Sequence, residues 1–156
     1  MLLGACATTP PEDNKPIATP LTSAINQPPQ HRLQSLASQA AYQYGVDRRL
    51  FHALITQESA WNPYAISRKG ARGLTQLMPL TGKSECGLDH HALFDPKLNL
   101  YCGAYYLGRL LRRFQSVELA LAAYNSGETR VARLGRVPNI RETRRYVRKI
   151  MESWGG

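Results

Sequence analysis

The sequence lacks any run of about 18 apolar residues, the length that a membrane-spanning helix requires. It also lacks segments in which apolar and polar positions alternate with β-branched residues, and it contains no internal repeats. These absences exclude a transmembrane helix and argue against a β-sheet protein. With 156 residues, 43% of them hydrophobic, the chain is long enough for one domain with a substantial core but not for two.

Acidic residues are scarce: 11 Asp and Glu stand against 20 Lys and Arg, which gives a net charge of +9. Residues 130 to 149 hold seven Arg and one Lys against a single acid, Glu142. Such an excess favours an anionic partner, although a solvated helix face is the more common reason for a charged stretch. The stretch contains no zinc-finger or RNA-recognition motif and no row of interleaved aromatic residues, so we expect no nucleic-acid partner.

Aromatic residues are absent from residues 10 to 30, which contain six of the ten prolines. A segment of this composition cannot bury enough apolar surface to offset its ordering entropy. We therefore expect a tether over residues 7–30, followed by one folded domain over residues 31–156.

The residues ahead of that tether, LGAC at positions 3 to 6, resemble the lipobox of bacterial lipoproteins. The resemblance implies that residues 1–6 are the remnant of an export signal and that Cys6 carries a lipid. Ala7 stands where an aspartate would signal retention in the inner membrane. The implied location is the bacterial periplasm, with a lipid anchor in the outer membrane as the only link to a membrane.

Only three cysteines are present, and two of them, Cys86 and Cys102, fall in the predicted domain. In an exported protein these two most simply form a disulfide, which would stabilise the fold by about 3 kcal/mol in the chain-entropy model. The alternatives are two unpaired core cysteines, or a zinc site that adds His90 and His91. The spacing C-x3-H-H-x10-C is not a standard set of zinc ligands, so we expect no metal.

Helical periodicity dominates the rest of the chain and predicts an all-α domain. A first apolar stripe ends at Gly45, and Asp47, Asp95-Pro96 and Ser116 are helix-start signals. The segment SRKGARGLTQLMPLTG, residues 67 to 82, is interpreted as a structured loop around a short helical turn. The expected helices span residues 33–44, 47–59, 96–114, 117–126, 128–134 and 141–153.

Glu58 interrupts the second of these helices. Phe51, Leu54 and Ile55 form its apolar face, and Glu58 occupies the next position of that face. Burial and the negative potential of the helix end both raise the pKa of a carboxyl group, so Glu58 is a candidate general acid. The alternative is a side chain that turns to solvent or pairs with an arginine at a frayed helix end.

Three short motifs favour the catalytic interpretation. They are ESAWNPYAISRKGARGLTQLMP at residues 58 to 79, AYNSG at 123 to 127, and ETRRYV at 142 to 147. In this order they resemble the signatures of the soluble lytic transglycosylase (SLT) catalytic domain family, a branch of the goose-type lysozyme-like superfamily. The resemblance implies a lysozyme-like fold with a glycan-binding cleft, and it covers roughly residues 45 to 153.

The resemblance also implies a reaction: cleavage of the β-1,4 bond between N-acetylmuramic acid and N-acetylglucosamine of peptidoglycan, with formation of a 1,6-anhydro ring. Glu58 would act first as acid and then as base, without a cofactor. Thr75, where the family usually has methionine, is expected to alter a substrate-lining contact. The implied substrate-binding residues are Ser67, Gln76, Met78, Tyr124, Asn125, Glu142 and Tyr146.

Two alternatives remain open on the sequence: a lysozyme-type hydrolase of the same fold, and a non-catalytic wall-binding module in which Glu58 serves packing. Residues 58 to 79 contain no second acid, which favours a nucleophile within the substrate over the two-carboxylate mechanism. The expected partner is peptidoglycan, whose peptide carboxylates suit a basic surface beside the cleft. A secretion, pilus, conjugation or other envelope-spanning machine is a further expected partner.

Overall fold

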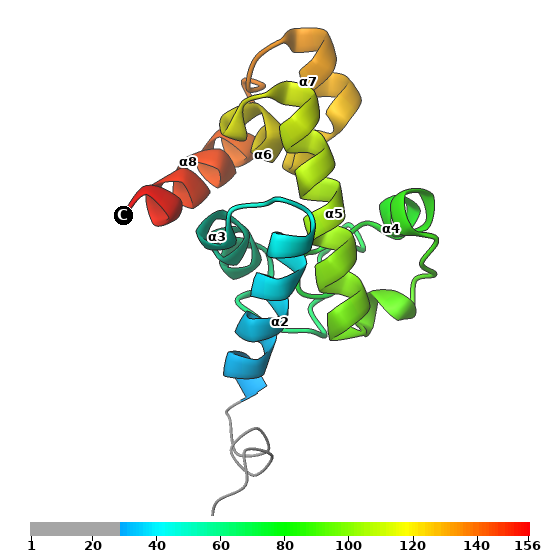
Figure 1. The fold of residues 1–156 in the computed structure, drawn as a ribbon. Helices are drawn as coiled ribbons and strands as arrows, with labels where there is room; N and C mark the ends of the chain where they lie inside the picture. The colour runs from blue at the N-terminus through cyan, green and yellow to red at the C-terminus, as the bar shows by residue number, and fades with distance from the viewer. Residues whose placement is uncertain (1–28) are drawn as a thin grey trace, which may run out of the picture.

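The computed structural model describes residues 29–156, which form seven α-helices and one short 3-10 helix (Figure 1). Helices are labelled as in Figure 1. They are α2 (Pro29–Gln43), α3 (Arg48–Ser59), α4 (Pro79–Cys86), the 3-10 helix η1 (Ala92–Phe94), α5 (Pro96–Phe114), α6 (Val117–Ser126), α7 (Glu128–Leu134) and α8 (Arg141–Gly155).

Side-chain caps begin the helices where the sequence predicts them. Oδ1 of Asp47 accepts from the backbone N of Leu50 at 2.9 Å, and the side chain of Asp95 does the same for Leu98 at 2.8 Å. Ser116 caps α6, and Pro96 occupies the first turn of α5. These caps satisfy backbone N–H groups that have no partner within the helix. The predicted all-α fold is confirmed.

The helices surround one main core. The long helix α5 packs against α2 and α6, while α3 packs against α2 and α8. Figure 1 shows α2 beside the lower half of α5, and α6 and α7 at the upper end of α5. Helix α8 packs against α3 and α6 and runs away from α5 toward the C-terminus. The largest fully buried core side chains include Leu50, Phe51, Leu54, Ile55, Leu74, Leu100, Leu107, Leu110, Leu121 and Ile150.

Helix α4 and the short 3-10 helix η1 are not among the helices expected from the sequence, and α4 is the longer of the two. Its eight residues, PLTGKSEC, carry no apolar stripe, and only Gly82 among them is buried. The helix lies on the outer side of α5 (Figure 1), where a disulfide between Cys86 and Cys102 joins the two helices. The predicted disulfide is therefore confirmed, and it leaves neither cysteine as a thiolate for the alternative zinc site.

The boundary predicted for the N-terminal tether needs a small correction. Residues 29 and 30 belong to α2, so the helix begins two residues before the expected start of the domain. The rest of the tether and Cys6 lie outside the described residues. Among residues 29–156, no helix has both the length and the apolar character needed to cross a membrane.

Candidate active site

Glu58 lies in the last turn of α3, whose core-facing side chains hold it in place. Phe51, Leu54 and Ile55 are fully buried, and Glu58 continues the face that they form. At this position the carboxyl group of Glu58 contacts α8: the hydroxyl of Tyr146 donates a hydrogen bond of 2.6 Å to Glu58 Oε1. The side chain is neither frayed into solvent nor paired with an arginine.

Burial changes the acidity of this carboxyl group. It raises the pKa of Glu58 from the ordinary value of 4.5 to about 7, because a carboxylate loses hydration energy in this setting. The hydrogen bond from Tyr146 acts in the opposite direction and offsets part of the effect. A group with this pKa is present in both protonated and ionised forms near neutral pH, as a residue that gives and then takes a proton requires.

Two hollows meet at Glu58. One, of about 450 Å³, is lined by Glu58, Ser67, Arg68, Lys69, Ala71, Gln76, Met78, Tyr124, Asn125 and Glu142. The other, of about 640 Å³, is lined by Gln57, Glu58, Asn125, Arg141, Glu142, Arg145, Tyr146 and Lys149. Glu58, Asn125 and Glu142 line both. The carboxyl group thus has open space on two sides, which suits a polymer that extends past the reacting bond.

All seven residues predicted to bind substrate line one of these two hollows. Met78 is 41% exposed and lines the hollow, rather than packing in the core. Asn125 is oriented by Thr143, whose hydroxyl donates to Asn125 Oδ1 at 2.9 Å. Glu142 is exposed, so the carboxylate of a second acid borders the same space as Glu58.

The loop between α3 and α4 presents Ser67 and Gln76 to the hollow. Ser67 Oγ accepts from the backbone N of Ala71 at 3.0 Å and so closes a tight turn. Nε2 of Gln76 donates to the carbonyl oxygens of Ala65 and Gly73, at 3.0 and 2.9 Å. These bonds use the donors of the Gln76 amide, so its Oε1 is the atom left to accept from a ligand.

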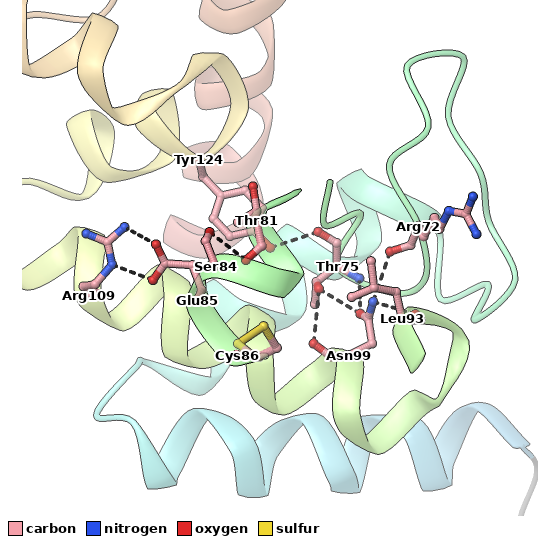
Figure 2. Close-up of a disulfide and its surroundings, with 11 residues drawn as sticks. Arg72, Thr75, Thr81, Ser84, Glu85, Cys86, Leu93, Asn99, Arg109 and Tyr124 are labelled. Atoms are coloured by element: carbon pink, nitrogen blue, oxygen red, sulfur yellow. Dashed lines mark hydrogen bonds and ion pairs between the residues drawn. A yellow bond between two sulfur atoms is a disulfide. The ribbon is translucent and has the colours of Figure 1, made fainter. Parts of the chain in front are cut away.

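Thr75 does not line the cleft, so the expectation of an altered substrate contact is wrong. Its side chain is completely buried, and its N and Oγ1 both donate to Asn99 Oδ1 at 2.8 Å. Nδ2 of Asn99 donates in turn to the carbonyl oxygens of Arg72 and Leu93 (Figure 2). Through these bonds Asn99, on α5, holds the segment that carries Gln76 and Met78.

Tyr124 joins this loop to the second motif. Its hydroxyl donates to the carbonyl oxygen of Thr75 at 2.9 Å, as Figure 2 shows, and its ring packs against Tyr106. Burial and the nearby Glu58 raise the pKa of the Tyr124 hydroxyl well above its ordinary value. Tyr124 therefore remains a neutral donor to the loop and a wall of the hollow.

Ion pairs of Arg109 stabilise the region around Tyr124 from the side of α5. Arg109 on α5 makes bidentate ion pairs with Glu85 of α4 and Glu128 of α7, with distances of 2.7 to 2.9 Å. Figure 2 shows the Glu85 pair beside the Cys86–Cys102 disulfide. Glu128 directly follows the motif that carries Tyr124 and Asn125, so the pairs fix that motif against α5.

The sequence interpretation missed several residues that line the hollows. Within α8, Arg141, Arg145 and Lys149 lie at spacing i, i+4, i+8, a helical repeat that flanks the motif containing Glu142 and Tyr146. The repeat is visible in the sequence, but a basic stretch alone predicts only a charged surface and not a lining of the hollow. Arg68, Lys69 and Gln57 lack any comparable pattern. Within residues 29–156, no group of three or more His, Cys, Asp or Glu residues is placed to hold a metal ion.

Comparison with known proteins places this geometry in context. The protein-family model described as the Transglycosylase SLT domain matches residues 35–147 of this chain. The chain is 43% identical over 96 residues to membrane-bound lytic murein transglycosylase F 1 of Alkalilimnicola ehrlichii, covering 57% of this chain and 19% of that protein. It is 40% identical over 114 residues to the transglycosylase of Enterobacteria phage PRD1, covering 73% of this chain and 40% of that protein.

A solved structure of a lytic transglycosylase has a similar fold. An inactive glutamate-to-glutamine mutant of the lytic transglycosylase Slt from Pseudomonas aeruginosa superposes with a TM-score of 0.71 and 30% identity. The match covers 81% of this chain and 24% of that protein. The chain thus spans less than half the length of these relatives. The matched region contains Glu58 and all three motifs, and the chain belongs to the transglycosylase SLT domain family.

Proposed function

We propose that the chain is a peptidoglycan lytic transglycosylase that cleaves the β-1,4 bond between N-acetylmuramic acid and N-acetylglucosamine, with Glu58 as its acid and base. The observation that carries this proposal is the half-buried carboxyl group of Glu58, with a pKa of about 7, at the junction of two hollows. Family membership and relatives named as lytic murein transglycosylases support it.

The proposed reaction needs only one carboxyl group. Protonated Glu58 gives its proton to the glycosidic oxygen as the bond from that oxygen to C1 of the muramic acid breaks. The resulting carboxylate takes the proton from the 6-hydroxyl of the same sugar, whose oxygen forms the new bond to C1. The products are a free N-acetylglucosamine end and a 1,6-anhydro ring, and Glu58 is protonated again. A nucleophile within the substrate replaces the second carboxylate of ordinary glycosidases.

The surroundings of Glu58 suit both halves of this cycle. Because burial raises the pKa of Glu58 to about 7, a substantial fraction of the carboxyl groups is protonated near neutral pH and can give the proton to a leaving oxygen. The hydroxyl of Tyr146 then stabilises the carboxylate that forms, because it donates to Oε1. Gln76, Met78, Tyr124 and Asn125 line the adjoining hollow, where they would contact the sugar rings.

A second candidate is hydrolysis by a lysozyme-type route. One observation favours it: the carboxylate of Glu142 borders both hollows that meet at Glu58, so it is a candidate base for an attacking water. In the lytic transglycosylase reaction the same carboxylate would instead accept a hydrogen bond from a sugar hydroxyl.

Digestion of purified sacculi separates these candidates. The full chain and its Glu58→Gln variant would be incubated with sacculi, and the released muropeptides would be weighed by mass spectrometry. We expect anhydro products from the wild type and none from the variant. Products heavier by one water molecule would make the enzyme a hydrolase. Sacculi that bind both proteins but release nothing would make the chain a non-catalytic wall-binding module.

For location, we propose the bacterial periplasm, with a lipid on Cys6 as an outer-membrane anchor. Support comes from the lipobox-like LGAC sequence and from relatives named as membrane-bound. Metabolic labelling with a fatty acid, compared between the wild type and Cys6→Ser, tests the anchor: only the wild type should incorporate label and sediment with outer membranes.

We also propose a secretion, pilus or conjugation machine as a partner. Cross-linking in cells tests this part of the proposal, because such a partner would be captured with the chain.

A further inference from the structure

One face of α8 carries a continuous row of cationic side chains. The residues of this row, at spacing i, i+3, i+4, i+7 and i+8, are exposed: Arg141, Arg144, Arg145, Arg148 and Lys149. The opposite face of the helix is buried against α3 and α6 through Thr143, Tyr146, Val147 and Ile150. Helical geometry therefore directs all five cations away from the core.

This cationic row runs out of the Glu58 hollow. Arg141, Arg145 and Lys149 line that hollow together with Glu58. A further hollow, of about 580 Å³, is lined by Asn139, Arg141, Arg144, Arg145 and Arg148. Arg141 and Arg145 border both. The two hollows are thus neighbours on one helix, and a ligand leaving the Glu58 hollow along α8 meets guanidinium groups.

Few acids neutralise the row. Among residues 29–156, its only ion pair joins Arg148 to Glu152 at 3.9 Å, and both side chains are more than two-thirds exposed. Such a pair contributes little to stability. Arg144 donates to Asn139 at 3.1 Å, which leaves its charge uncompensated. By contrast, Arg109 and Arg113 elsewhere on the surface pair with Glu85 and Glu128.

Like charges at spacing i, i+4 destabilise an isolated helix, so an uncompensated row lowers stability unless an anion binds. The sugar rings of the proposed glycan substrate carry no charge. The peptides linked to the lactyl groups of muramic acid do carry free carboxylates, and they project from the strand on either side of the reacting bond. Guanidinium groups bind carboxylates in a bidentate geometry.

We propose that the outer part of this face, centred on Arg144 and Arg148, binds peptide carboxylates of the strand held at Glu58 and makes the enzyme prefer peptide-bearing over peptide-free strands. This inference rests on the proposed function. It assigns the cleft a substrate class, peptide-substituted glycan, that the sugar-lining residues alone do not select.

The test compares two substrates and three forms of the full chain. The substrates are glycan strands with their peptides and the same strands after an amidase has removed them. The proteins are the wild type, the variant Arg144→Gln/Arg148→Gln, and the control Arg130→Gln/Arg133→Gln. The control removes the same charge from exposed positions on α7 that line neither hollow. The readout is the ratio of kcat/KM for peptide-bearing to peptide-free strands.

We expect the ratio to fall about three- to ten-fold in Arg144→Gln/Arg148→Gln and to stay at the wild-type value in the control, as suits two exposed charge contacts. An unchanged ratio, or an equal fall in the control, would overturn the inference. Loss of binding to a DNA duplex in the first variant, with no change in the ratio, would make the face a general polyanion surface and also overturn it.

Failure of the proposed function has a different signature. A wild type that cleaves neither substrate would contradict the proposed function alone. Co-sedimentation of the three proteins with the two kinds of strand would then decide the inference, because weaker binding of Arg144→Gln/Arg148→Gln to peptide-bearing strands alone supports it. Equal binding by all three proteins would overturn it.

Discussion

The hydroxyl of Tyr146 donates to the carboxyl group of Glu58 over a distance of 2.6 Å, although the two residues lie 88 positions apart in the sequence. The bond joins α8 to the last turn of α3. It brings the third motif of the sequence onto the first residue of the first motif. The chemistry of the site therefore depends on the packing of α3 against α8 as much as on either helix alone.

Replacement of Glu58 by glutamine should stabilise the protein at alkaline pH. Folding raises the pKa of Glu58 from 4.5 to about 7, so the folded chain binds this proton more tightly than the unfolded chain. That advantage is fully present below pH 4.5 and is lost as the pH rises to about 7. Compared with glutamine, ionised Glu58 then costs at most about 3 kcal/mol.

Urea unfolding at pH 4 and pH 8 measures this effect. We expect Glu58→Gln to match the wild type at pH 4 and to exceed its free energy of unfolding at pH 8, while losing activity at both. The exposed control Glu152→Gln should change stability by less than about 0.5 kcal/mol at either pH. A Glu58→Gln variant that is less stable than the wild type at pH 8 would contradict the raised pKa.

Replacement of Tyr146 by phenylalanine should shift the pH dependence of activity. The variant keeps the buried ring but removes the hydrogen bond that lowers the pKa of Glu58. The pKa should then rise further, and the alkaline limb of kcat/KM should move to higher pH. Activity at the optimum should fall, since the carboxylate formed in the reaction loses a donor. The matched control is Tyr105→Phe, because Tyr105 lines the hollow beside the disulfide and not the hollows at Glu58. An equal shift of the alkaline limb of kcat/KM in this control would refute the role assigned to the Tyr146–Glu58 hydrogen bond.

Replacement of Asn99 by aspartate should destabilise the fold by about 2–4 kcal/mol. The substitution keeps the acceptor for Thr75 but removes the Nδ2 donor, leaving the carbonyl oxygens of Arg72 and Leu93 against a buried carboxylate. Urea unfolding measures the loss. In the control Asn62→Asp, the exposed side chain keeps its role as acceptor for Tyr64, and stability should be unchanged. Equal stability of the two variants would show that Asn99 does not organise the loop.

Removal of the disulfide should cost about 3 kcal/mol, since it closes a loop with a sequence separation of 16 residues. The test compares urea unfolding of the wild type and of Cys86→Ala/Cys102→Ala, each with and without a reductant. Only the wild type should lose stability on reduction, and it should then approach the variant. Reductant-insensitive unfolding of the wild type would argue that α4 is held by the Glu85–Arg109 pair instead.

Periodicity and caps predicted α3, α5 and α6 to within a residue or two, because each has a side-chain N-cap and a buried face. They did not predict α4, whose sequence has no apolar face and whose position depends on tertiary bonds at Cys86 and Glu85. The importance of Glu58 can be predicted from the sequence because Glu58 interrupts an apolar stripe. The burial of Thr75 cannot, since a loop has no period that distinguishes inward from outward side chains.

The contact between Thr75 and Gly103 has an evolutionary consequence. A Cβ atom added at Gly103 would lie 2.5 Å from Oγ1 of Thr75, which is too close for a normal contact. A side chain larger than that of glycine at position 103 would therefore push α5 away from the loop that carries Thr75. A methionine at position 75, usual in the family, would also lose the side-chain bond to Asn99. Positions 75, 99 and 103 should therefore covary among homologues, and transplanting one of them alone into a relative should be poorly tolerated.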